Sequence, residues 1–273
     1  MPIPLKCRLS RLLASAAVTA ILAAGLGGCQ TMSDITGSIS SKSDASPDPD
    51  PRRSAETYGE RYRANPKDAD SALKYGQALR ATGQRTQAVA VLEQATIAHP
   101  GNKPLLAAYG RALADNGNFQ QAFDVLTRAH SPDNPDWRIL SVQGTALDQL
   151  GRHDEARGYY ASALKIAPEE PSVLSNLGLS YVLSRDLPKA EEILRRAFAN
   201  TRADARVRQN LGLVVGLQGR FAEAETIVKA DLPADEAAAN VAYLKQMLSR
   251  KDNPKVGAGT VPVAALSAVP TGR

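Results

Sequence analysis

The sequence has few of the residues on which enzyme chemistry and small disulfide-rich folds depend. It contains two cysteines and three histidines among 273 residues, and Phe, Trp and Tyr together make up 5%. Two cysteines exclude a disulfide scaffold and a zinc module with several cysteine ligands. The scarcity of aromatic rings argues against a β-sandwich or barrel. Because 43% of the residues are hydrophobic, the chain can still build a folded core.

An excess of charge of one sign is also missing. The chain has 33 Lys and Arg against 28 Asp and Glu, which gives a formal net charge of +5. Lys6, Arg8 and Arg11 lie in a segment that we expect to be removed, which would leave a net charge of +2. Such weak basicity predicts no nucleic-acid partner.

Catalytic motifs are absent from the sequence. It has no HExxH, no CxxC, no serine nucleophile elbow and no strand–glycine loop–helix unit that would hold a phosphate. His99, His130 and His153 fall at different phases of the repeat described below, so we expect no histidine cluster, and His153 is expected to pack at a turn. We therefore predict a protein that is no enzyme and has no cofactor, no metal and no small-molecule substrate.

The apolar stretch near the N-terminus is too short for a permanent membrane span. Leu12–Leu26 has 15 residues, whereas a helix needs roughly 20 to cross the hydrocarbon core. A basic start precedes this run and Gly27-Gly28 follows it. Residues 1–28 are therefore predicted to be an export signal peptide.

Cys29 directly follows this segment. Leu26-Gly27-Gly28-Cys29 resembles the lipobox of bacterial lipoproteins. The resemblance implies that the Cys29 sulfur carries a diacylglyceryl group, and two or three acyl chains anchor a protein stably. A stray thiol near a cleavage site is the alternative. Since Gln30 rather than Asp follows the cysteine, the resemblance favours the periplasmic face of the outer membrane of a Gram-negative bacterium over the inner membrane.

Two segments lack any apolar period. After the lipidated cysteine, residues 29–52 are rich in Ser, Asp and Pro and are predicted to be a flexible tether. Residues 251–273 carry several prolines and glycines and are predicted to be a disordered tail. A folded part is left at 53–250.

Between these segments the sequence repeats with a period of 34 residues. The first column contains Gly76, Gly110, Gly144, Gly178 and Gly212. The second contains Ala88, Ala122, Ala156, Ala190 and Ala224. A turn column of glycines is interrupted by Arg185, and a third alanine column by Asp231. These two departures put the fourth turn and the last second helix in question.

Glycine inside a helix costs about 1 kcal/mol relative to alanine, so the first column needs a steric reason. Close packing of two helices supplies one, because the missing side chain lets the partner helix approach. The residues expected to fill this space are Leu92, Leu126, Tyr160, Leu194 and Val228.

These columns are similar to those of the tetratricopeptide repeat. The resemblance covers five units over 69–238 and implies an all-α tetratricopeptide-repeat solenoid of about five helix hairpins. Ser54–Asn65 is expected to be a solitary N-terminal capping helix, and Asp235–Arg250 a C-terminal one.

The repeat resemblance also implies a concave groove lined by the first helices. The predicted peptide-binding residues are Asn176, Leu179, Val182, Arg206, Asn210, Leu213 and Leu217. In one interpretation the asparagines and Arg206 hold an extended peptide. In the other, the apolar residues pack against the capping helix through Val241, Tyr243 and Leu244, which leaves no open groove.

Two short segments carry a further resemblance. Asp34–Ile39 and Ala239–Met247, together with the lipobox and five repeats, resemble the TadD-like lipoproteins of the tight-adherence (Flp) pilus machinery. The resemblance implies a pilotin or assembly factor whose partners are the secretin and pilus assembly subunits. A general type IV pilus pilotin, a scaffold for peptidoglycan hydrolases and a β-barrel assembly component remain open alternatives.

Overall fold

The computed structural model describes residues 50–131 and 133–251, all within the unit Thr31–Arg273. The predicted signal peptide, Cys29, most of the tether and the tail from 252 onward lie outside the described residues. The described part contains twelve α-helices and no strand. None of these helices has a stretch long and apolar enough to cross a membrane.

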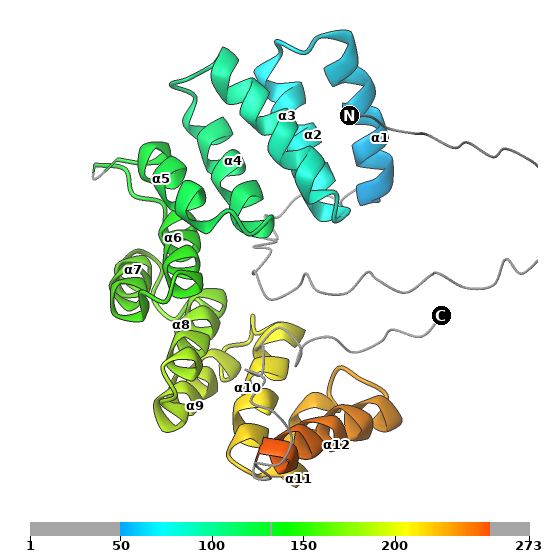
Figure 1. Ribbon diagram of the computed structural model, residues 1–273, viewed down its shortest axis with the longest axis vertical. Helices are drawn as coiled ribbons and strands as arrows, with labels where there is room; N and C mark the ends of the chain where they lie inside the picture. The colour runs from blue at the N-terminus through cyan, green and yellow to red at the C-terminus, as the bar shows by residue number, and fades with distance from the viewer. Residues whose placement is uncertain (1–49, 132, 252–273) are drawn as a thin grey trace, which may run out of the picture. The chain divides into compact units, whose positions relative to one another are not determined.

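The helices form hairpins in chain order (Figure 1). Their bounds are α1 Pro51–Ala64, α2 Ala69–Ala81, α3 Arg85–Ala98, α4 Lys103–Asp115, α5 Phe119–Ala129, α6 Trp137–Gln149, α7 His153–Ile166, α8 Pro171–Leu183, α9 Leu187–Phe198, α10 Ala205–Leu217, α11 Phe221–Val228 and α12 Ala234–Lys251. The pairs from α2–α3 to α10–α11 make five hairpins, α1 precedes them and α12 follows. The predicted all-α repeat fold with one helix at each end is confirmed.

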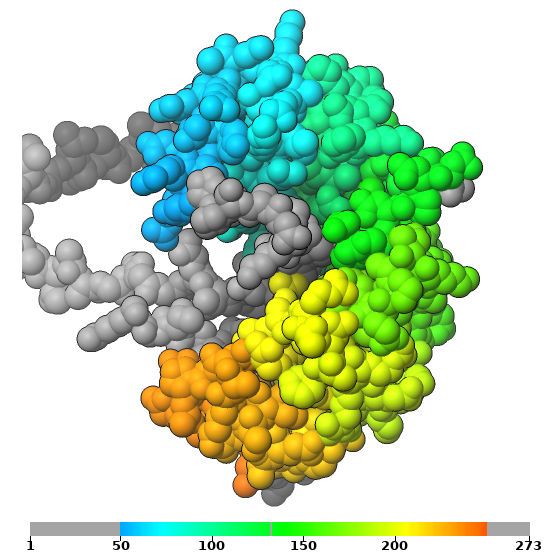
Figure 2. Space-filling view, turned by 180° about the vertical axis from the view of Figure 1, so that it is seen from behind, coloured from blue at the N-terminus to red at the C-terminus, as the bar shows by residue number. Residues whose placement is uncertain are grey.

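Each helix packs on its neighbours along the chain, and Figure 2 shows the units following one another without mixing. The five first helices, α2, α4, α6, α8 and α10, also pack on one another in sequence. They form a continuous layer, which we call the first-helix layer.

Most first helices begin at an acidic or amide side chain that satisfies free backbone N–H groups. Asp68 accepts from the Ser71 amide at 2.8 Å, and Asn102 accepts from the Leu105 amide at 3.1 Å. Asp204 repeats this contact with the Val207 amide at 3.1 Å. These caps fix where each unit starts.

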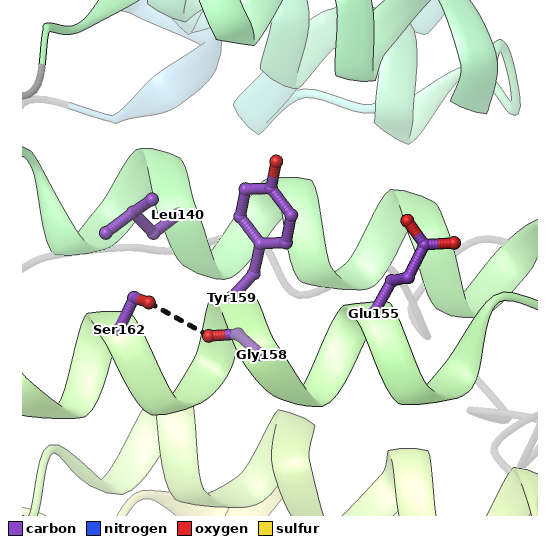
Figure 3. Close-up of a pocket in the computed structure, with 5 residues that line it drawn as sticks. All are labelled: Leu140, Glu155, Gly158, Tyr159 and Ser162. Atoms are coloured by element: carbon purple, nitrogen blue, oxygen red, sulfur yellow. Dashed lines mark hydrogen bonds between the residues drawn. The ribbon is translucent and has the colours of Figure 1, made fainter.

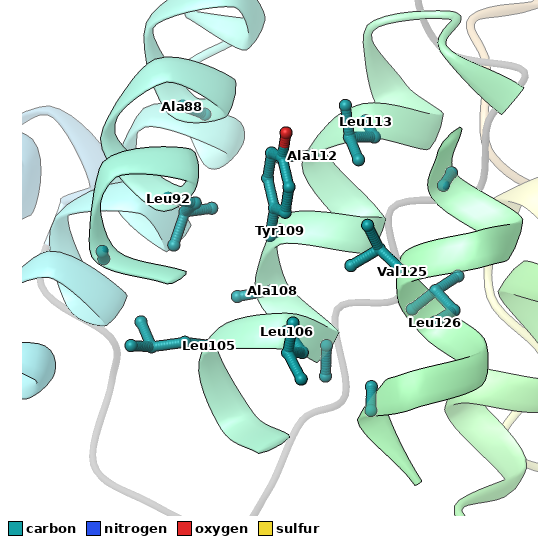
Figure 4. Close-up of a cluster of buried hydrophobic side chains, with 14 of the residues drawn as sticks. Ala88, Leu92, Leu105, Leu106, Ala108, Tyr109, Ala112, Leu113, Val125 and Leu126 are labelled. Atoms are coloured by element: carbon teal, nitrogen blue, oxygen red, sulfur yellow. The ribbon is translucent and has the colours of Figure 1, made fainter. Parts of the chain in front are cut away.

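Side chains of the second helices fill the space beside the glycines of the first helices. A Cβ added to Gly76 or Gly110 would lie 2.5 Å from the leucine of its hairpin. The same atom at Gly144 would lie 2.6 Å from the Tyr160 ring. Figure 4 shows Leu92, Leu126 and their neighbours packed between the helices of the first two units. The predicted pairing of glycine with a large residue is confirmed.

The two departures from the repeat have local explanations. Gly151 and the other turn glycines have φ between 75° and 84°, and Arg185 takes the same left-handed conformation with φ 65°. The fourth turn therefore has the same backbone conformation as the others, although Arg185 replaces the glycine. Near Asp231 the pattern does change, because α11 ends at Val228 and Asp231 forms an ion pair with Arg208, Nε to Oδ2 2.6 Å.

The end helices dock on small residues as the hairpins do. A Cβ on Gly59 in α1 would lie 3.0 Å from the Tyr75 ring of α2. At the other end, a Cβ on Gly216 in α10 would lie 2.5 Å from Leu244 Cδ2 of α12. The glycines thus allow α1 and α12 to cover the two ends of the stack.

Candidate functional site in the first-helix layer

The twelfth residues of the first helices are Arg80, Ala114, Asp148, Val182 and Gly216. All except Ala114 contact the next first helix or, in the case of Gly216, the capping helix α12. Their chemistry changes along the chain. Units one and three have the charged Arg80 and Asp148 at this position, and unit two has Ala114. Units four and five have the uncharged Val182 and Gly216.

In the first unit this contact is an ion pair. Arg80 Nε donates to Asp115 Oδ2 at 2.6 Å, between α2 and α4. Their side chains are only 14% and 8% exposed. The pair is therefore largely shielded from water, which strengthens it but makes each charge dependent on the other.

Asp148 forms the centre of a buried polar network in the third unit. The carboxylate accepts hydrogen bonds from Ser180 of α8 at 2.8 Å and from Tyr160 of α7 at 2.9 Å. His153 Nδ1 lies 2.9 Å from the same carboxylate. Burial and the Asp148 charge raise the pKa of Tyr160 well above its ordinary value, so its hydroxyl stays a donor. Asp148 and Ser141 are both buried.

Val182 occupies the same place one period later and is 9% exposed. It packs with Leu211, Val214 and other residues of α9 to α11, and Leu179, Leu217 and Val241 pack against this cluster. Val182 was predicted to line the groove. It is buried instead, because its side chain packs against the next first helix, α10.

The capping helix α12 completes this apolar half. Leu244 is buried against Gly216, and Val241 contacts the cluster of Val182. Tyr243, expected to pack with them, is 46% exposed. This arrangement corresponds to the interpretation in which apolar residues pack on the capping helix.

The two asparagines form a ladder between first helices. Asn176 Nδ2 donates to Ser141 Oγ at 3.1 Å, and Asn210 Nδ2 donates to Ser175 Oγ at 2.8 Å. In both cases the partner lies 35 residues earlier in the chain. One amide N–H of each asparagine is thus used within the fold, and both residues remain half-buried.

Two other predicted residues, Arg206 and Leu213, lie on α10 and are half-buried. Arg206 interacts with other groups of the chain. Leu213 belongs to none of the buried clusters of the described residues. Part of its apolar surface is left for a ligand.

Arginines gather on the first-helix layer of the first three units. Arg111 of α4 is half-buried between Arg80 on α2 and Arg138 on α6, and burial together with the Arg80 charge lowers its pKa. Arg138 lies over the Trp137 ring, 4.5 Å from its centroid.

A shallow hollow lies outside this layer, between α6 and α7 (Figure 3). Its lining residues are Leu140, Glu155, Gly158, Tyr159 and Ser162. Two of these side chains are engaged locally, since Ser162 donates to the Gly158 carbonyl at 3.0 Å and Glu155 pairs with Arg152 at 2.7 Å. The hollow offers no converging donors for a small ligand.

The histidines are separate in the fold. His130 contacts Gln143, and His153 at the start of α7 contacts Asp148. His99 Nε2 lies 2.8 Å from the Lys67 carbonyl oxygen. Among the described residues, no three His, Cys, Asp or Glu side chains form a group that could hold a metal ion.

Three family models match parts of the chain. Two tetratricopeptide-repeat models match residues 147–212 and 110–171. A model described as anaphase-promoting complex, cyclosome, subunit 3 matches residues 52–129. A search among curated proteins gives no significant match.

Solved structures share the fold at low sequence identity. The Cut9 and Hcn1 hetero-tetramer of the anaphase-promoting complex has a chain with TM-score 0.60 and 18% identity over 76% of this chain, which spans only 41% of that one. PilW, a type IV pilus biogenesis factor, matches with TM-score 0.61 and 18% identity over 70% of this chain and 90% of its own. PilF of Pseudomonas aeruginosa matches with TM-score 0.53 and 18% identity over 67% and 86%. The described part of this chain is a solenoid of five tetratricopeptide repeats with a capping helix at each end.

Proposed function

We propose that the protein is a lipid-anchored scaffold on the periplasmic face of the outer membrane that acts as a pilotin or assembly factor for the secretin of a tight-adherence (Flp) pilus. The observation that carries this proposal is the likeness to PilW, a type IV pilus biogenesis factor of which this chain spans 90%. PilF supports it with the same architecture. Both likenesses establish the fold, and the role is our inference from them.

The N-terminal sequence supports the anchored location. The lipobox-like Leu26-Gly27-Gly28-Cys29 supplies a lipid attachment site, and the Ser- and Pro-rich tether separates it from α1. A permanent anchor with a tether would hold the repeats at the membrane surface and still let them turn toward a partner.

The repeats supply the binding function. Tetratricopeptide repeats are protein-interaction scaffolds, which are generally non-enzymatic. We place the partner on α10, the first helix of the last unit, where Arg206, Asn210 and Leu213 are half-buried. An Asn amide and an Arg guanidinium suit a peptide backbone, and Leu213 suits an apolar side chain.

The test is native co-purification from detergent-solubilised envelopes, with identification of the partners by mass spectrometry. Wild-type protein is expected to recover a secretin and pilus assembly subunits. Replacing Arg206 and Asn210 together by alanine should abolish this recovery while circular dichroism still shows folded helices, although the loss of the Asn210–Ser175 hydrogen bond should lower the melting temperature somewhat. Recovery of peptidoglycan hydrolases instead would overturn the pilus role in favour of the alternative scaffold.

A second experiment tests the lipid anchor, with the other cysteine as the matched control. Cys29→Ala should move the protein from the membrane to the soluble fraction, whereas Cys7→Ala, which changes the other cysteine, should leave it in the membrane. Membrane retention of Cys29→Ala would contradict the lipid anchor.

A further inference from the structure

Three arginines lie on three successive first helices. Arg80 is on α2, Arg111 on α4 and Arg138 on α6. Only Arg80 has a carboxylate partner, Asp115 at 2.6 Å. Asp136, the other nearby acid, uses its Oδ1 to accept the backbone N–H of Arg138 at 2.8 Å. Asp115 and Asp136 act against the lowering of the Arg111 pKa and so partly offset the cluster, but three arginines face only two carboxylates.

Arg111 is the exceptional member. Within residues 50–131 and 133–251, its guanidinium has neither a hydrogen bond nor an ion pair. It is half-buried, and its burial and the cations of Arg80 and Arg138 lower its pKa. A desolvated cation beside other cations costs free energy unless an anion compensates it.

The neighbouring side chains are held in fixed positions. The Arg80 guanidinium is fixed by Asp115, and the Arg138 guanidinium lies 4.5 Å from the Trp137 ring centroid, where a cation–π contact orients it. Fixed guanidiniums lose little conformational entropy when a ligand binds. Their planar forks match carboxylates, with which they form paired hydrogen bonds.

We propose that Arg111, flanked by Arg80 and Arg138, forms a binding site for the carboxylates of an acidic, extended segment of a partner protein. This rests on the proposed function only in that the ligand is a protein. The chemistry of the segment and its place in the first three units are new, since the partner contacts proposed above lie on α10. A single cation cluster on a weakly charged chain is too small for a nucleic-acid backbone.

The test is fluorescence anisotropy of fluorescein-labelled hexaglutamate with the purified full-length protein in detergent, compared with labelled hexaglutamine. Hexaglutamate is expected to bind, more weakly as salt rises, and hexaglutamine not to bind. Arg111→Gln should weaken hexaglutamate binding about tenfold or more. Arg128→Gln, which removes an exposed charge from α5 of the same hairpin, should change it by less than about twofold.

Melting temperatures distinguish a ligand site from a structural role. Arg111→Gln is expected to melt at or above the wild-type temperature, because a half-buried cation without a direct hydrogen-bond or ion-pair partner is removed. Equal weakening by Arg111→Gln and Arg128→Gln would overturn the site, as would a lower melting temperature of Arg111→Gln with unchanged hexaglutamate binding. Failure to bind hexaglutamate while a secretin still co-purifies would defeat this inference alone and leave the proposed function standing.

Discussion

At the twelfth position of the first helices, the two halves of the first-helix layer use different chemistry. In units one to three, neighbouring first helices are joined by the Arg80–Asp115 pair and by the hydrogen bonds of Asp148. In units four and five the same place is taken by Val182 and Gly216, which pack on apolar side chains. A repeat can therefore keep its geometry while its contacts change from polar to apolar.

This difference has an energetic consequence. Apolar contacts tolerate small displacements because they have no direction, whereas buried polar groups lose free energy when a partner leaves. The polar half should therefore be the more sensitive to substitution, and the apolar half the more tolerant. The variants below test this comparison, in order of expected effect.

The largest loss is expected for Asp148→Ala. It would leave the buried hydroxyls of Ser180 and Tyr160 without their acceptor, at a cost of about 3 kcal/mol. Urea unfolding followed by circular dichroism measures the change.

Val182→Ala is the matched variant, because Val182 lies one period from Asp148. Its loss of two buried methyl groups should cost about 2 kcal/mol. If Val182→Ala proved the more destabilising of the two, the polar half would not be the more sensitive one.

A loss no larger than that of Val182→Ala is expected when a methyl group is added between the helices of a hairpin. Gly144→Ala would place a Cβ 2.6 Å from the Tyr160 ring, which Asp148 holds in position, and should cost about 2 kcal/mol. Gly212→Ala in the apolar half meets Val228 Cγ1 at 2.6 Å and should cost about 1 kcal/mol, because no hydrogen bond fixes that side chain. Chemical denaturation of both variants makes the comparison.

Gly158→Ala is the control for these two variants. Gly158 lies on α7 with nothing within 4 Å of an added Cβ. Its substitution should stabilise the protein by about 0.5–1 kcal/mol through helix propensity. A loss at Gly158 equal to that at Gly144 would show that glycine is needed for a reason other than close packing.

The hairpins, their register and both capping helices could be predicted from the sequence, because a period of 34 residues fixes which faces of the helices meet. The contacts between successive first helices could not, because the partner of each twelfth residue belongs to the next unit. Val182 was therefore expected in the groove and lies in the core. The asparagine ladder could have been predicted from the sequence, because the same Ser-to-Asn spacing of 35 residues occurs twice, between Ser141 and Asn176 and between Ser175 and Asn210.

The turn of unit four allows a stabilising change in the apolar half. Arg185 is exposed and holds φ at 65°, where the other turns of this column have glycine. An L-residue in this conformation costs about 1 kcal/mol, so Arg185→Gly should stabilise the protein by up to about that amount, or a few degrees in melting temperature. Gly151→Ala, the reverse change in unit three, should destabilise it similarly. A lower melting temperature for Arg185→Gly would show that its side chain outweighs the backbone strain.

The smallest effect is expected at alkaline pH, again in the polar half. Burial and the neighbouring Glu93 raise the pKa of Tyr109 to about 12, whereas an unfolded tyrosine titrates near 10. The folded state therefore binds this proton more tightly, so the stabilisation is fully present below about pH 10 and is lost as the pH rises toward 12.

Tyr109→Phe should reduce the loss of stability between pH 9 and pH 11, measured by urea unfolding, although Tyr160 would still contribute. An identical alkaline loss in wild type and Tyr109→Phe would mean that the Tyr109 proton is held no more tightly in the folded protein, and that this part of the polar half does not differ from the apolar one.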